Sequence, residues 1–215
     1  MENSLFAADG VYARVMNRLW NYIIISLLWL LCCIPVVTIG ASCTAAYFTA
    51  AKVIRGKEGK PISEFFHAFR LNIKQGICFT VIYGAVLAVL LLECYYLYQQ
   101  SSVPLPVLYL FYGMALVLIA SGQYLFACLS RFTLGNFALF RMAALATFRH
   151  LISTILLLLL LVVTTVGIYL MPWGIFIFPG LMFWLKSYIT EPVLRKYMPP
   201  REEADPDEQK WYYNI

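Results

Sequence analysis

Residues 19–51 read LWNYIIISLLWLLCCIPVVTIGASCTAAYFTAA and contain no charged residue, whereas the segment 52–60 that follows is rich in lysine and arginine. A helix needs about 20 apolar residues to cross the hydrocarbon core of a bilayer, so this stretch is too long for one crossing and suits two. Pro35 lies near its middle, where a chain that reverses direction tolerates a proline. The stretch therefore predicts a helical hairpin in a membrane.

The composition excludes an ordinary soluble domain. Of the 215 residues, 62% are hydrophobic and 13% are charged, with a mean hydropathy of +0.76, whereas soluble domains carry about 25% charged residues. The apolar runs are continuous rather than alternating, which favours spanning helices over barrel strands. A signal peptide fits residues 19–51 less well, because its apolar core is only about 7–15 residues long.

Further apolar runs extend the hairpin into a bundle. The predicted crossings are 19–34, 36–54, 76–98, 105–130, 151–170 and 172–190. Lysine and arginine precede the first crossing and follow the second, fourth and sixth, while the turns within each pair contain none. This pattern predicts cytoplasmic N- and C-termini. The predicted fold class is an all-α polytopic membrane helical bundle, with about six transmembrane helices in three hairpins.

The second crossing, 36–54, is rich in small residues, which let helix backbones approach closely in lipid. We predict that it packs in the interior of the bundle. A re-entrant half-helix that begins after Gly40 is the alternative. The candidate helix-packing residues are Gly40, Ala41, Ala45, Ala46 and Ala50.

Two amphipathic stretches, 62–74 and 136–150, precede the third and fifth crossings. Each combines an apolar face containing phenylalanine with a basic face, which is typical of a helix that lies in the membrane interface. The alternative is an elbow that only leads into the next crossing. The candidate interfacial or partner-docking residues are Phe65, Phe66, Phe69, Arg70, Lys74, Phe148 and Arg149.

Two polar residues inside the crossings, Glu93 and Gln123, are candidate intramembrane functional groups, because an ionisable or polar group at membrane depth often marks a functional site. Glu93 lies near the outer end of its crossing, where its carboxylate reaches water, and this favours a structural role. Groups such as Gln123 more often form hydrogen bonds between helices. Lys186 is interpreted as extending toward the basic side of the membrane.

The sequence contains no recognisable catalytic, nucleotide-binding or metal-binding motif. We therefore expect a non-enzymatic protein without cofactors or metals. The six cysteines are interpreted as small buried hydrophobic residues. The membrane explains the basic residues, so nucleic acid is not an expected partner. Residues 1–200 are predicted to form a single transmembrane domain, and the acidic residues 201–215 a cytoplasmic tail.

Several stretches resemble the YesL-like family of bacterial integral membrane proteins, which is catalogued as domain of unknown function 624. They are PVVTIGA at 35–41, AAYF at 45–48, FFHAFRLNIKQ at 65–75, FPGL at 178–181 and LRKY at 194–197. The resemblance implies a location in the cell membrane and an association with bacterial carbohydrate ABC import systems. It implies no catalytic or binding residues.

These observations lead to two hypotheses. In the first, the protein is an accessory or regulatory subunit that docks on the permease subunits of a carbohydrate ABC importer through its helix faces and elbows. In the second, it is a small oligomeric transporter or channel with its own path, lined by the second crossing and the region of Gln123. The expected partners are membrane lipid and either permease subunits or further copies of the chain.

Overall fold

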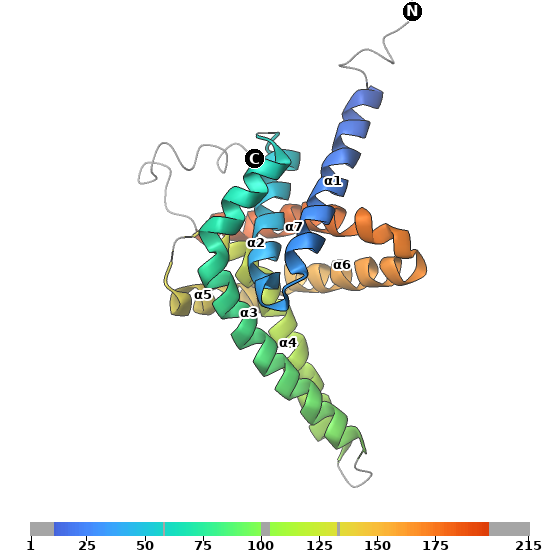
Figure 1. The fold of residues 1–215 in the computed structure, drawn as a ribbon. Coiled ribbons are helices and arrows are strands. Elements are labelled where there is room, and N and C mark those ends of the chain that lie inside the picture. Colours follow the sequence, from blue (N-terminus) through green and yellow to red (C-terminus); the bar gives the residue numbers. More distant parts are fainter. Residues whose placement is uncertain (1–10, 58, 100–103, 133, 198–215) are drawn as a thin grey trace, which may run out of the picture.

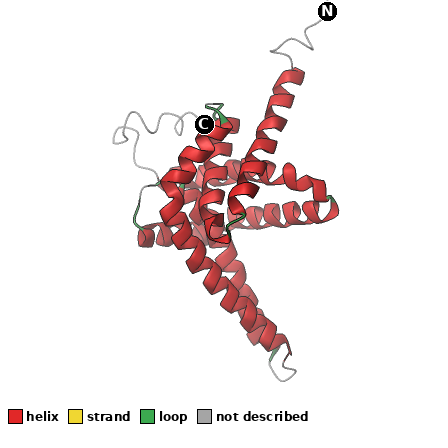
Figure 2. Ribbon diagram, viewed as in Figure 1, coloured by secondary structure: helices red, strands yellow, loops and turns green. Residues whose placement is uncertain are grey.

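The computed structural model describes residues 11–57, 59–99, 104–132 and 134–197, and these residues form helices without any strand (Figures 1 and 2). Five segments are long and apolar enough to cross a membrane: Val15–Cys33, Val36–Arg55, Pro61–Gln99, Leu105–Leu129 and Leu151–Leu170. The predicted fold class, an all-α membrane helical bundle, is confirmed. The predicted acidic tail lies outside the described residues.

Helices α1 (Val11–Cys33) and α2 (Ile39–Thr49) form the first hairpin. Its turn is closed by Thr38, whose hydroxyl donates to the carbonyl of Pro35 at 2.7 Å. A 3-10 turn, η1 (Val36–Thr38), leads into α2, and a π-helix, η2 (Ala50–Arg55), continues it. The chain is thus helical from Val36 to Arg55, which favours a complete crossing over a re-entrant half-helix.

This second crossing lies in the interior of the bundle. In the 18-residue apolar stretch of this crossing, 67% of the residues are buried, compared with 11% in the corresponding stretch of Leu151–Leu170. The backbone of α2 lies against α3 (Pro61–Gln99), where the Gly40 amide donates to the Thr80 hydroxyl at 2.8 Å. A Cβ atom at Gly76 would lie 2.7 Å from the Cα of Ala41, so glycine is required there for this close approach. All five candidate helix-packing residues are buried: Gly40, Ala41, Ala45, Ala46 and Ala50.

The second hairpin consists of α3 and α4 (Leu105–Leu129). The amphipathic stretch 62–74 does not form a separate interfacial helix but is the first part of α3. At 1.5 Å per residue this 39-residue helix is about 58 Å long, well above the hydrocarbon thickness of about 30 Å, so part of it must lie outside the hydrocarbon. The other amphipathic stretch does form its own helix, α5 (Asn136–Arg149), and the chain bends at His150 before the next crossing.

Helices α6 (Leu151–Leu170) and α7 (Phe178–Leu194) form the third hairpin, joined by a 3-10 helix, η3 (Pro172–Phe176). With 17 residues, α7 is about 26 Å long and is not among the five candidate crossings, which is a departure from the six predicted. Pro179 lies in the first turn of α7, where a proline begins a helix without disrupting it.

The three hairpins are splayed. Figure 1 shows α7 lying across α1 and α2 with α6 alongside α7, while the far ends of α3 and α4 extend away from both pairs. In the 18-residue apolar stretches of α3, α4 and α6, only 17%, 22% and 11% of the residues are buried. Because so much apolar surface faces outward, lipid or another membrane protein must cover it. The core lies where the hairpins meet, around the fully buried side chains of Tyr47, Tyr124, Phe65 and Phe183.

Candidate functional site

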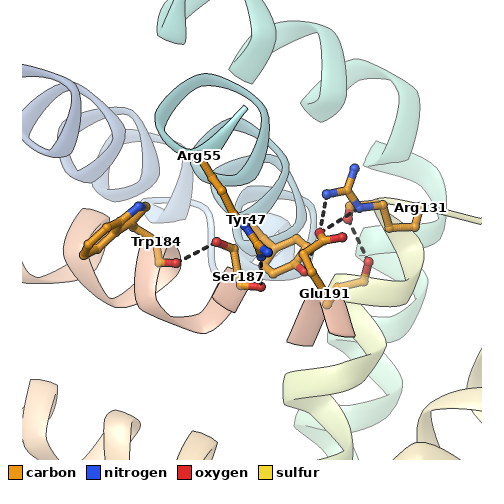
Figure 3. A network of polar contacts seen from close by, with 8 residues as sticks. Tyr47, Arg55, Arg131, Trp184, Ser187 and Glu191 are labelled. Carbon is orange, nitrogen blue, oxygen red and sulfur yellow. Dashed lines mark hydrogen bonds and ion pairs between the residues drawn. The ribbon is translucent and has the colours of Figure 1, made fainter. Parts of the chain in front are cut away.

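A buried ion pair connects the three hairpins. Arg131 follows directly after α4, and its guanidinium donates through Nε and Nη2 to Oε1 of Glu191 in α7. The distance from Nε to Oε1 is 3.1 Å. The Tyr47 hydroxyl in α2 donates to the same oxygen at 2.9 Å. The side chains of Arg131 and Glu191 are both fully buried. Figure 3 shows Tyr47, Arg131 and Glu191 pointing toward one another, so each hairpin contributes one residue to this junction.

A second set of contacts ties the end of the first hairpin to α7. The Arg55 guanidinium donates to the carbonyl of Ser187 at 2.8 Å (Figure 3). It also lies 4.6 Å from the ring centroid of Tyr188. Lys52, in the same π-helix, pairs with Glu64 in the first turn of α3 at 2.8 Å. Two basic residues at the end of the second crossing therefore hold neighbouring helices together.

Lys186 directly precedes Ser187 in α7 and is also buried, with only 3% of its surface exposed. Its Nζ donates to Oε1 of Gln123 in α4 at 2.7 Å and lies 5.9 Å from the Tyr47 ring centroid. The interpretation that Lys186 extends to the basic surface is therefore wrong, because α7 directs this side chain into the bundle. Of the two candidate intramembrane polar groups, Gln123 belongs to this contact, whereas Glu93 is exposed on α3.

A partly open cavity of about 470 Å³ lies beside Lys186 and Gln123. Its walls come from every hairpin, with α3, α4, α6 and α7 contributing most of the lining. Most of the lining side chains are apolar, including Leu87, Leu118, Phe126, Leu161, Ile168 and Met182. A buried cation next to an apolar cavity is an arrangement that suits a ligand with one negatively charged end and an otherwise apolar body.

The elbow candidates are distributed between core and surface. Phe65 is fully buried, and its ring stacks on that of Phe69 at a centroid distance of 6.3 Å. Phe65 therefore belongs to the core and is not available for docking, because this first elbow packs as part of α3. The other candidates lie wholly or partly at the surface: Phe66, Phe69, Arg70, Lys74, Phe148 and Arg149.

Sequence reasoning did not find the junction of Tyr47, Arg131 and Glu191, whose ion-paired residues are 60 positions apart. One feature of the sequence pointed to this junction. Glu191 is an acidic residue at the end of an apolar helix, and a buried carboxylate requires a partner. Among the described residues, no group of three or more histidine, cysteine, aspartate or glutamate side chains is arranged to hold a metal ion.

Residues 22–94 match the model of a family described as "Protein of unknown function, DUF624". The resemblance to DUF624 drawn from the sequence is confirmed over these residues, which are about a third of the chain. This DUF624 segment covers α1 from Tyr22 onward, the rest of the first hairpin and most of α3, including the close contact between Gly40 and Gly76. No curated protein and no solved structure matches the chain.

Proposed function

We propose that this protein is a non-enzymatic integral membrane subunit that associates with a bacterial carbohydrate ABC importer in the cell membrane. The resemblance to the YesL-like family motivates the importer, and the DUF624 match supports that resemblance over residues 22–94. The splayed hairpins also support a subunit role, since their outward apolar surfaces are available to neighbouring membrane proteins.

The observation that carries the proposal is the outer face of α5. Leu139, Ala143 and Ala146 are fully buried on its inner face. The outer face, which is exposed, consists of Phe137, Arg141, Leu145, Phe148 and Arg149. Exposed aromatic and arginine side chains on one helix face are the residue types enriched in protein interfaces. We therefore assign the outer α5 face as the docking surface for a permease subunit.

Photo-crosslinking tests this surface directly. A photoreactive amino acid at position 148 is expected to form an adduct with a permease subunit in native membranes. The matched control is position 159 in α6, where Leu159 is 56% exposed but lies within a crossing. Adducts of position 148 that contain only lipid, or the same permease yield at both positions, would contradict the proposal.

We expect the Phe148→Ala substitution to weaken copurification of the permease about tenfold, because truncating an aromatic anchor in an interface costs more than about 1 kcal/mol. Phe148 is 62% exposed, so the substitution leaves the core unchanged. The measurement is the amount of permease recovered with the tagged protein at matched expression. Tyr169→Ala in α6, at an 85% exposed position, is the control and is expected to have no effect.

The cavity favours a second candidate, a small oligomeric transporter or channel. Its position between the hairpins is the observation in favour, but its lining is mostly apolar and does not resemble a polar path for sugars. Uptake of a labelled solute by liposomes that contain only this protein would support the transporter. Uptake that requires the importer would support the subunit.

In either case we propose that both termini and the loop between η2 and α3 are cytoplasmic. The basic residues near the ends of η2, α4, α5 and α7 support this orientation, since lysine and arginine accumulate on the cytoplasmic side of membrane proteins. The turn between α6 and α7, with Pro172 and Trp173, contains no charge and is assigned to the opposite side.

A further inference from the structure

The cavity beside Lys186 has few polar groups that are able to bind a ligand. Thr80, Thr164 and Thr165 line it, but each hydroxyl donates to a carbonyl of its own helix, at 2.7, 2.8 and 2.9 Å. The Tyr83 hydroxyl pairs with Ser121 Oγ, and Trp29 Nε1 donates to Cys43 Sγ, each at 3.3 Å. The Lys186 ammonium and the Gln123 amide remain, and they are 2.7 Å apart on one side of the cavity. The cavity thus combines extensive apolar walls with a single polar end.

The charge at this polar end is not neutralised within the described part of the chain. The ion pairs there are Lys52–Glu64 and Arg131–Glu191, and neither includes Lys186. An ammonium group has three donor hydrogens, and Gln123 Oε1 accepts one of them. Because burying a cation costs several kcal/mol unless an opposite charge offsets the loss of hydration, an anionic ligand would be bound favourably here.

We propose that this cavity binds a single-chain amphiphile with a carboxylate head, such as a long-chain fatty acid. The carboxylate accepts hydrogen bonds from Lys186 Nζ and from the Gln123 amide nitrogen, and the acyl chain lies along the apolar walls. The volume of about 470 Å³ falls within the range of about 300–1,000 Å³ that is usual for small-ligand sites.

The same chemistry argues against a sugar as the ligand of this cavity. A sugar carries hydroxyl groups on all sides, and burying each of them without a partner costs free energy. The cavity offers polar groups at one end only, so most of those hydroxyls would contact apolar side chains. The inference is therefore independent of an association with a carbohydrate importer, and its failure would leave that proposal standing.

The test compares two ligands of equal chain length, hexadecanoic acid and hexadecanol, by displacement of a fluorescent fatty acid from the purified protein in non-ionic detergent. We expect the acid to bind at least about tenfold more tightly than the alcohol, because one charge-assisted hydrogen bond contributes about the free energy of a tenfold change in affinity. The Lys186→Met substitution is expected to remove this preference by weakening the acid alone, with Lys74→Met at the exposed start of α3 as the control.

A second variant tests the apolar part of the site and does not alter any charge. Gly84 lines the cavity, and a Cβ atom there would meet nothing within 4 Å, so Gly84→Leu adds side-chain volume at the cavity wall with open space at its Cβ position. We expect both ligands to bind more weakly to it. The matched control is Gly113→Leu in α4, which also has open space but lies in a different groove.

Four outcomes would overturn the proposal. Equal affinity for acid and alcohol in the unsubstituted protein would show that the cavity accepts any alkyl chain. A preference for the acid that survives Lys186→Met would place the carboxylate elsewhere. Binding that is unchanged in Gly84→Leu would place the chain outside the cavity. Phosphatidylglycerol is included as a two-chain anionic competitor, and displacement by it in preference to the fatty acid would also contradict the single-chain assignment.

Discussion

Replacing Glu191 with leucine is expected to destabilise the protein by about 3–5 kcal/mol, because Arg131 would remain buried without its carboxylate partner. The Tyr47 hydroxyl would lose its acceptor as well. Since each hairpin contributes one residue to this junction, the loss should separate the hairpins rather than unfold one helix. The measurement is the thermal melting temperature of the purified protein in mild detergent, together with its elution as a single species.

A double substitution provides the control for this prediction. Replacing a buried ion pair as a whole by apolar residues of similar volume is often neutral or stabilising. The combination of Arg131→Met with Glu191→Leu is therefore expected to restore much of the stability that Glu191→Leu loses. If Glu191→Leu alone melts at the temperature of the unsubstituted protein, the junction does not hold the hairpins together.

The second large effect is expected at Gly76, where a Cβ atom would lie 2.7 Å from both the Cα and the backbone nitrogen of Ala41. These are backbone atoms of a packed helix and have little room to move. We expect Gly76→Ala to cost about 1–3 kcal/mol, as overpacking of a close contact does. The measurement is again the melting temperature, with helix content checked by circular dichroism.

Gly84 is the matched control because it lies on the same helix, two turns later, with open space at its Cβ position. Gly84→Ala is expected to stabilise α3 by roughly 0.5–1 kcal/mol, since alanine loses less conformational freedom than glycine in a helix. The two substitutions should therefore have effects of opposite sign. Equal effects would mean that α2 and α3 do not approach as closely as the structure places them.

The architecture was largely predictable because charge and hydropathy follow the membrane. The uncharged run 19–51, interrupted by Pro35 and bounded by basic residues, is sufficient to predict the first hairpin. The first elbow was predicted less well. Nothing between Lys74 and Gly76 stops a helix, so α3 continues from the amphipathic part into the crossing. The sixth predicted crossing begins with the 3-10 helix η3, so α7 itself has only 17 residues.

The candidate site was less predictable, because its contacts join different hairpins. Gln123 was recognised as a polar group inside a crossing, but its partner Lys186 is 63 positions away. The periodicity of one helix indicates which residues share a face. It does not indicate which face of another helix they contact. The interpretation of Lys186 was mistaken because the predicted crossing ended at residue 190, whereas α7 continues to Leu194 and has Lys186 at its middle.

The central claim is that the chain forms three membrane hairpins whose basic ends lie on one side. The most direct test is the accessibility of single cysteines, introduced as Lys57→Cys or Trp173→Cys after replacement of the six native cysteines. With a membrane-impermeant maleimide on intact cells, we expect label at position 173, and label at position 57 only after permeabilisation. Labelling of both positions from the same side of the membrane would contradict the account.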